Sequence, residues 1–365
     1  MKNVFGNNIT YTLFGESHGP YVGIVIDGLP AGLKVDEEYI EREMAKRRAG
    51  GSWSTSRREA DIPQFVSGVK DGYTEGTPVA ILIPNNNVRS ADYADMQHLA
   101  RPGHADYTAE CKYDGFQDIR GGGHFSGRLT AAIVAAGAIV RQALEDKGIL
   151  IGTHVRKLAG ISDRKFENYH ADIEKLNGKA FAVLDEEAGK KMAVAIEVAK
   201  SEGDSLGAVL ETAVIGLEAG IGEPTFDSLE GVLAHGLFAI GGIKGVSFGA
   251  GFDLADMKGS QANDIFRMKD GEVIALPNNN GGINGGISNG MPIIINCAVK
   301  PTSSISLPQK TVDYKKMENA EICIQGRHDP VIAVRARAVV DAIVAMCLAE
   351  MLVQRYGYQW LRSEA

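Results

Sequence analysis

Cysteine is scarce in this chain, and its spacing suits neither a metal site nor a disulfide framework. Cys111, Cys297, Cys323 and Cys347 lie far apart among 365 residues, and no Cys-x-x-Cys pair is present. A zinc ribbon needs such pairs, and a small disulfide-stapled protein is much richer in cysteine. We therefore expect no metal site and reduced thiols, as in a cytoplasmic protein.

Excess positive charge and long apolar runs are also lacking. The formal net charge is -8, whereas a nucleic-acid-binding protein carries a basic field. Residues 1–11 lack the apolar core of a signal peptide, and the most apolar stretch, 129–140, is too short to cross a bilayer. We expect a soluble cytoplasmic protein that binds neither nucleic acid nor membrane and whose arginines serve a small anionic ligand.

Glycine is plentiful, at 44 residues, yet the glycine-rich nucleotide-binding motifs are missing. None of the glycine runs has the G-x-G-x-x-G pattern, and none continues into the Gly-Lys-Ser/Thr end of a P-loop. These are the motifs with which dinucleotide-binding folds and P-loop NTPases hold phosphate groups. The sequence therefore favours neither of those folds.

Histidine, arginine and glycine gather in three short segments that are far apart in the chain. They are Phe14-Gly15-Glu16-Ser17-His18-Gly19, Arg101-Pro102-Gly103-His104-Ala105-Asp106 and Gly326-Arg327-His328-Asp329-Pro330. Histidine exchanges protons near neutral pH, and arginine matches the geometry of phosphate and carboxylate. Adjacent glycine lets the backbone approach a ligand closely. The segments predict one proton-transferring, anion-binding site assembled from distant parts of the fold.

A faint internal duplication organises the chain. Gly-Leu-Pro-Ala-Gly-Leu at 28–33 recurs as Gly-Leu-Glu-Ala-Gly-Ile at 216–221, and Gly-Thr-Pro-Val-Ala-Ile at 76–81 recurs as Gly-Met-Pro-Ile-Ile-Ile at 290–295. In each half an arginine–histidine–aspartate segment and a long apolar helix pattern follow. We expect a single domain over residues 1–365, with pseudo-repeat halves at about 1–150 and 206–356 and an insertion at about 151–205.

The elements predict an α+β fold with two mainly antiparallel sheets around central helices. Strands are expected at 22–26, 79–83, 207–215 and 292–299, and helices after Asp36, at 126–144, near 184–201 and at 331–354. The strands lack the regular βαβα alternation of a doubly wound sheet. Asp36 is a predicted helix cap, and Asp227 with Glu230 resembles a capping box.

Some charged residues have a purely structural alternative. Arg128 falls in the first turn of a helix, where a cation opposes the helix dipole unless an anion is bound there; the alternative is a surface ion pair. Arg47 suits a helix C-terminus. Asp329 stands where a helix cap belongs, with Pro330 at the first helical position, so a cap alone would explain it. His18 and His104, taken singly, could be structural.

Taken together, these residues resemble the chorismate synthase family over essentially the whole chain. The likeness lies in Gly15-Glu16-Ser17-His18-Gly19 running on to Asp27-Gly28-Leu29-Pro30, in Ser126-Gly127-Arg128, and in Gly326-Arg327-His328-Asp329-Pro330. Further segments that look like the family are Arg101–Tyr107, Glu202-Gly203-Asp204-Ser205 and Lys300-Pro301-Thr302-Ser303-Ser304-Ile305.

The resemblance implies a lyase of the shikimate pathway, which leads to the aromatic amino acids. It would convert 5-enolpyruvylshikimate 3-phosphate to chorismate and phosphate by 1,4-anti elimination, with reduced FMN required and no net redox change. The family further implies a β-α-β sandwich with internal duplication, assembled as a homotetramer. Reduction of the flavin by the protein itself, with NADPH, or by a separate flavin reductase stays open.

The resemblance also assigns roles to residues. His104 would be the general acid towards the departing phosphate, His18 would keep the flavin reduced and protonated, and Asp329 would be the base towards the flavin. The substrate's anionic groups would be held by Arg47, Arg101, Arg128 and Arg327. The flavin positions would be Ser126, Gly241, Gly242, Gly285, Lys300, Thr302, Ser303, Ser304 and Arg327.

The chain departs from the family pattern at two places. His124-Phe125 stands where many members have Arg-Ser, and Trp53 stands where many have a basic residue. Two other functions compete with the elimination. A flavin-dependent NAD(P)H oxidoreductase would consume pyridine nucleotide stoichiometrically, and a non-catalytic anion-binding oligomer would be insensitive to loss of His18 or His104.

Overall fold

The computed structural model describes residues 3–48, 50, 53, 60–86, 98–324 and 329–362. Within them the chain forms two five-stranded sheets, and every strand pairing is antiparallel. The first sheet has the order β1 (Val4–Phe5), β2 (Thr10–Gly15), β3 (Tyr21–Asp27), β7 (Val79–Pro84) and β4 (Gln64–Ser67). The second has the order β11 (Ile243–Phe248), β16 (Ile293–Val299), β10 (Ala208–Ile215), β8 (Leu150–Leu158) and β9 (Ile161–Ser162). An α+β fold with antiparallel sheets is confirmed.

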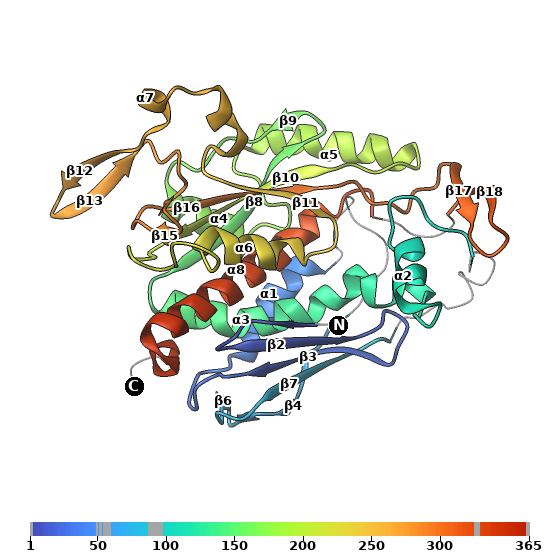
Figure 1. Cartoon of the computed structure of the whole chain (residues 1–365), viewed down its shortest axis with the longest axis horizontal. Coiled ribbons are helices and arrows are strands. Elements are labelled where there is room, and N and C mark those ends of the chain that lie inside the picture. Colours follow the sequence, from blue (N-terminus) through green and yellow to red (C-terminus); the bar gives the residue numbers. More distant parts are fainter. Residues whose placement is uncertain are drawn as a thin grey trace.

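Three helices lie between the sheets (Figure 1). They are α1 (Glu37–Arg47), α3 (Thr130–Asp146) and α8 (Ala333–Tyr356). α3 packs on β3 and β7 of the first sheet, whereas α8 packs on β8 and β10 of the second, and the two helices pack on each other. The sheets are therefore joined through a helical layer.

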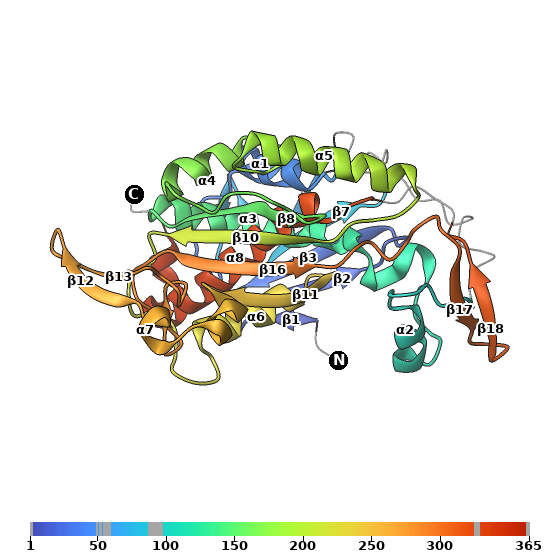
Figure 2. The same ribbon diagram turned by 90° about the horizontal axis from the view of Figure 1, so that it is seen from above.

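α4 (Tyr169–Asn177) packs on β8 and β10 of the second sheet and α5 (Glu186–Ser201) packs beside β9, so the two helices lie along one side of this sheet, while β16 and β11 face the viewer in Figure 2. α6 (Leu229–Phe238) contacts α8 and β11. Smaller elements extend from this body: α2 (Asp106–Tyr113) with the hairpin β17 (Gln309–Asp313) and β18 (Glu318–Ile322) at one end, and the hairpin β12 (Ile265–Lys269) and β13 (Glu272–Leu276) at the other (Figure 1). The remaining short pieces are β5 (Val69–Lys70), β6 (Tyr73–Thr74), α7 (Gly259–Ala262), β14 (Ile283–Asn284) and β15 (Ile287–Ser288).

The expected strands at 22–26, 79–83, 207–215 and 292–299 all form, each within a residue or two of its predicted ends. Asp36 caps α1 as predicted, since its Oδ1 accepts a hydrogen bond from Tyr39 N at 3.0 Å. The capping box at Asp227 is wrong: Ser228 is the cap of α6, and its Oγ accepts from Gly231 N at 3.0 Å.

The helix-cap alternative for Asp329 is also wrong. α8 begins at Ala333, with Ile332 at the capping position and no side-chain cap. The helix therefore starts about one helical turn later than predicted. The carboxylate of Asp329 instead accepts a hydrogen bond from Arg335, with Oδ2 2.7 Å from Nη1. A helix-capping role therefore does not explain the presence of an aspartate at position 329.

The most apolar run of the sequence is longer as a helix than the sequence indicates. The 3₁₀ turn η3 (Gly127–Leu129) and α3 together make a helix of 20 residues that is apolar enough to cross a membrane. The prediction that this apolar stretch is too short to cross a membrane is therefore wrong. However, 89% of its most apolar window is buried inside the molecule, which identifies it as a core helix.

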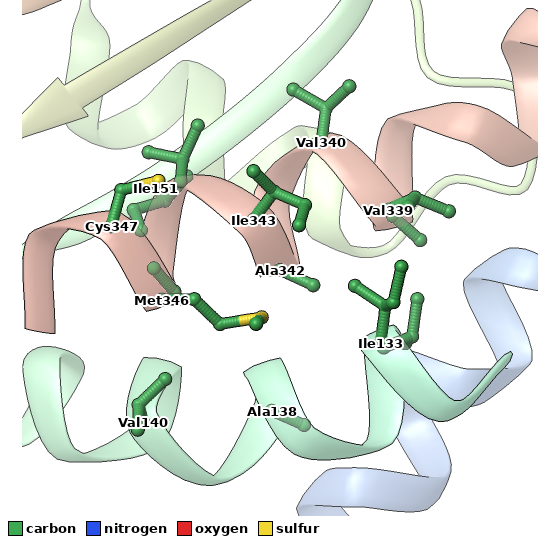
Figure 3. Close-up of a cluster of buried hydrophobic side chains, with 14 of the residues drawn as sticks. Ile133, Ala138, Val140, Ile151, Val339, Val340, Ala342, Ile343, Met346 and Cys347 are labelled. Atoms are coloured by element: carbon green, nitrogen blue, oxygen red, sulfur yellow. The ribbon is translucent and has the colours of Figure 1, made fainter. Parts of the chain in front are cut away.

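α3 and α8 form the centre of the core (Figure 3). Ile133 and Val140 of α3 face Val339 and Met346 of α8, and all four are at most 7% exposed. The helices approach each other closely at Gly137, where an added Cβ would lie 2.5 Å from Ala342 Cβ. Only glycine fits at this position because any side chain would enter the facing helix.

Gly137→Ala tests this close approach. The new methyl group would force α3 and α8 apart, so we expect the free energy of unfolding to fall by about 1–3 kcal/mol. Gly259→Ala in α7 is the matched control, because nothing lies within 4 Å of its added Cβ; it should change stability by less than about 1 kcal/mol. Urea unfolding of both variants measures the difference, and equal effects would contradict the close-approach account.

Candidate functional site

Three of the predicted site residues, Arg47, Arg128 and Asp329, lie where α1 ends and just before α3 and α8 begin. Arg47 is the last residue of α1; its Nε donates to Thr130 Oγ1 at 2.8 Å and its Nη2 donates to Gly127 O at 2.9 Å. Arg335 in the first turn of α8 donates from Nε to Arg47 O at 2.8 Å. These bonds tie the three central helices together at one end of the molecule.

Arg47 and Arg128 share one carboxylate, that of Asp61. Arg47 Nη1 lies 2.7 Å from Asp61 Oδ2, and Arg128 Nη1 contacts Asp61 Oδ1. All three side chains are at most 4% exposed. Burial by itself would raise the pKa of Asp61, but the charges of Arg47 and Arg128 outweigh it and lower that pKa. Arg128 therefore forms an ion pair with an aspartate, but deep in the protein rather than on its surface.

Asn85 connects this arginine pair to the loop that carries His18. Its Oδ1 accepts from Arg128 Nε at 2.7 Å, and its Nδ2 donates to Gly19 O at 2.8 Å and to Glu16 O at 3.0 Å. The loop joins β2 to β3, which are antiparallel. Although residues 15–19 have the spacing G-x-S-x-G, this is a hairpin connection, whereas a hydrolase nucleophile elbow joins a strand to a helix.

The glycine run 121–123 brings the two predicted histidines to the same place. A Cβ on Gly121 would lie 2.5 Å from His18 Nε2, and one on Gly122 would lie 3.4 Å from His104 Nε2. Both glycines have positive φ, +60° and +85°, which side chains adopt reluctantly. The missing side chains are what allow two histidines from distant loops to approach adjacent residues.

His104 belongs to a compact cluster with Arg101 and Asp106. Its Nδ1 lies 2.8 Å from Asp106 Oδ1 and 3.1 Å from Arg101 Nη2. Arg101 grips Asp106 with two bonds of 2.7 Å, Nε to Oδ2 and Nη2 to Oδ1. Burial would raise the pKa of Asp106, but the hydrogen bonds from Arg101 and His104 hold it well below its usual range.

Several predicted flavin-binding residues meet at the end of β16. Lys300 N donates to Gly242 O at 2.9 Å, and Lys300 Nζ donates to Ser303 Oγ at 2.7 Å. Lys300 Nζ also contacts Gly103 O, so this group touches the His104 loop. Burial, and then the nearby Lys244, lower the pKa of Lys300.

Other predicted residues are placed less closely. Ser126 caps η3, and its Oγ accepts from Arg128 N at 3.3 Å. Ser304 follows Ser303 and is half-buried, and Gly241 precedes Gly242 in the turn before β11. Gly285 lies between β14 and β15, at the end of the molecule opposite α2 (Figure 1). The structure does not bring Gly285 together with the others, and Arg327 lies outside the described residues.

The two departures from the family pattern have local partners. His124 Nδ1 lies 2.9 Å from Gly15 O, which ties the glycine run to the end of β2. Phe125 is 42% exposed and makes an edge contact with Tyr113. Trp53 stacks on Phe181, with ring centroids 5.4 Å apart. In the part of the chain that the structure describes, no group of three or more His, Cys, Asp or Glu side chains is placed to hold a metal ion.

Comparison with known proteins decides the family. A family model described as chorismate synthase matches residues 9–353. Chorismate synthase of Pyrococcus abyssi is 44% identical over 350 residues, which cover 96% of this chain and 97% of the relative. Chorismate synthase of Methanosarcina mazei is 45% identical over 353 residues, 96% of each chain. The chain belongs to the chorismate synthase family.

The fold agrees with that membership. A crystal structure of chorismate synthase matches with a TM-score of 0.75 and 27% identity, covering 96% of this chain and 94% of that chain. Chorismate synthases are lyases, so the protein is an enzyme rather than a non-catalytic anion-binding oligomer. Asp61 and Asn85 contact predicted site residues but were not themselves predicted from the sequence. Both stand in polar loop segments without a motif, and only the fold shows that they contact Arg128.

Asp61→Ala tests the shared carboxylate. It removes the anion that two buried guanidinium groups contact, so we expect the free energy of unfolding to fall by about 3–5 kcal/mol. Asp118→Ala is the matched control, since Asp118 pairs with a half-exposed Arg120 at 2.8 Å and should cost no more than about 1 kcal/mol. Urea unfolding at fixed pH gives both values; a loss at Asp61 as small as that at Asp118 would show that the pair is not a buried ionic contact in solution.

Proposed function

We propose that the protein converts 5-enolpyruvylshikimate 3-phosphate to chorismate and phosphate by a 1,4-anti elimination that requires reduced FMN. In this reaction a ring C–H bond and the C–O bond to phosphate break and a new C=C bond forms. The observation that carries the proposal is the convergence of His18 and His104 on adjacent glycines, next to arginines held at the ends of the central helices. Such a site can bind several anionic groups and move a proton between them.

The arginines account for the charge of the substrate, which has two carboxylates and a phosphate. We assign its anionic groups to Arg47, Arg101, Arg128 and Arg327. Asp61 and Asp106 each neutralise part of the positive charge of the arginines, so the guanidinium groups can stand close together before the substrate binds. Guanidinium groups held by fixed partners bind an anion with little reorganisation.

His104 is the proposed general acid towards the departing phosphate, because one of its ring nitrogens is held by Asp106 and the other lies beside Gly122. His18 is proposed to keep the flavin in its reduced, protonated form. Asp329 is proposed as the base towards the flavin, with Arg335 fixing its carboxylate at 2.7 Å. Reduced FMN, when bound, would supply electron density as the phosphate leaves and recover it with the ring hydrogen.

The residues at the end of β16 fit a flavin with a phosphate tail. Thr302 Oγ1 is buried and has no hydrogen-bond partner among the described residues. Lys300 and Ser303 supply a cation and a hydroxyl beside it, and a Cβ on Gly241 would meet nothing within 4 Å. An orphan hydroxyl next to a lysine and an open glycine suits a polar ligand. Ser126, Gly242, Ser304 and Arg327 complete the proposed flavin set within one chain, whereas Gly285 stands apart from it.

The finer architecture also belongs to the proposal. We infer a β-α-β sandwich with internal duplication, because the core strand orders β2-β3-β7-β4 and β8-β10-β16-β11 match in chain order, with α1 and α6 and then α3 and α8 in equivalent places. β8 lies within the segment predicted as the insertion, yet it pairs with β10 of the second half. On this ground we infer that the second half starts near residue 150 and that the insertion covers 161–205 rather than 151–205. A homotetramer in the cytoplasm is proposed from the family resemblance.

The function is tested by anaerobic assay of phosphate release and chorismate formation from 5-enolpyruvylshikimate 3-phosphate. We expect turnover with dithionite-reduced FMN and none with oxidised FMN, with FMN needed only in catalytic amount. A parallel reaction with oxidised FMN and NADPH distinguishes self-reduction from dependence on a separate flavin reductase. Stoichiometric NADPH oxidation without phosphate release would instead favour the flavin-dependent NAD(P)H oxidoreductase.

The acid is tested by His104→Ala. Loss of a general acid should lower kcat by roughly 10²–10⁴ while FMN binding is retained. His170→Ala is the control, because His170 is exposed on α4, which lies at the opposite end of the molecule from α2 (Figure 2). A decrease of less than about tenfold in His104→Ala would remove His104 from that role.

A further inference from the structure

One carboxylate links the proposed acid to a proposed substrate-binding arginine. Asp106 Oδ1 faces His104 Nδ1 at 2.8 Å and Arg101 Nη2 at 2.7 Å. Asp106 Oδ2 accepts from Arg101 Nε at 2.7 Å and from Arg101 N at 3.0 Å. The three side chains come from one hexapeptide, whose turn is closed by His104 N donating to Arg101 O at 3.1 Å.

The geometry indicates whether Nδ1 of His104 carries a proton. A ring nitrogen either donates or accepts, so Nδ1–H can bond to Asp106 or bare Nδ1 can accept from Arg101. The contact to Asp106 is the shorter, 2.8 Å against 3.1 Å, and its acceptor is an anion. Arg101 also holds Asp106 from the other side, which keeps the carboxylate in place. Nδ1 therefore keeps its proton, and Nε2 is the nitrogen available for proton exchange.

The fold supports an ionised Asp106. It is the first residue of α2, where the positive end of the helix dipole favours a negative charge. The loop is anchored at Gly103, whose carbonyl accepts from Ser303 Oγ at 2.8 Å and contacts Lys300 Nζ. Charged and titratable groups packed around the cluster are His18 across Gly121, Lys300 at Gly103, and Tyr314, whose pKa is raised by burial and then by Glu110 and Asp106.

Resting on the proposed acid role of His104, we infer that Asp106 is a positioning residue of the elimination. It fixes the tautomer of His104 so that Nε2 faces the substrate, places a negative charge 2.8 Å from the ring, and couples that acid to Arg101. A His–Asp pair of this kind resembles the orienting carboxylate of a catalytic triad, here serving an acid. Binding of an anion at Arg101 and proton delivery from His104 are thereby set by the same side chain.

Asp106→Asn tests the inference by two measurements. The first is the pH titration of the His104 ring by nitrogen-15 NMR of the intact protein with FMN, assigned by comparison with His104→Gln. Loss of the neighbouring negative charge should move the midpoint of this titration down by about one pH unit. The second is the pH dependence of kcat/KM with reduced FMN, whose alkaline limb should move down by a similar amount.

Controls separate charge from structure. Asp106→Glu keeps a carboxylate and should restore most of both midpoints, whereas a merely structural residue would show no such rescue. Asp114→Asn removes the same charge at the other end of α2, in a left-handed position that asparagine tolerates, and should leave both midpoints in place. If Asp106→Asn does not fold, Asp106→Ser is the second charge-free variant.

An NMR midpoint that stays unchanged in Asp106→Asn would overturn the inference at its root, because Asp106 would then not act on His104. A midpoint that moves while the pH–rate profile does not would show that the coupling exists but that His104 is not the acid. That result would overturn the proposed role of His104, and with it the catalytic part of the inference, without affecting the flavin-dependence assay.

Discussion

The packing of α3 against α8 is the constraint on which the rest of the structure depends. Each helix contacts a different sheet, so the close approach of Gly137 to Ala342 contributes to the spacing between the two sheets. The same two helices begin at the candidate site, where η3, which leads into α3, carries Arg128 and α8 follows Asp329. A change in their packing would therefore change both the core and the spacing of the anion-binding groups.

The charge of the site is managed in pairs. The protein is acidic overall, yet three arginines are gathered within a small region, and each is held by an aspartate: Arg47 and Arg128 by Asp61, and Arg101 by Asp106. Buried guanidinium groups without such partners would be costly to assemble. The aspartates thus allow these guanidinium groups to stand together in the interior, as the proposed binding of a substrate with three anionic groups requires.

Much of the fold could be predicted from the sequence, because burial imposes apolar runs that are easy to read. The strand 208–215 and the helix 130–146 are buried along nearly their whole length, and both were found close to their true ends. Helix starts were less predictable. The cap of α6 is Ser228 rather than the preceding Asp227, and Asp329 forms an ion pair with Arg335 rather than a cap. A cap depends on backbone angles, which cannot be read from the sequence.

The candidate site shows the same division. His18, His104 and Arg101 stand in motifs with glycine and could be recognised by residue type. Asp61 and Asn85 could not, since their importance comes only from contacts made across the fold. The family resemblance supplied the roles of the flavin positions, and for Gly285 the single chain gives no geometric support.

The most direct test of the account is a structure of the protein with oxidised FMN and 5-enolpyruvylshikimate 3-phosphate bound together. The account predicts the substrate phosphate within hydrogen-bonding distance of His104 Nε2 and Arg101, and the flavin against Lys300, Thr302 and Ser303. A substrate bound away from the ends of α1, α3 and α8, with His104 Nε2 out of reach of any phosphate oxygen, would contradict it.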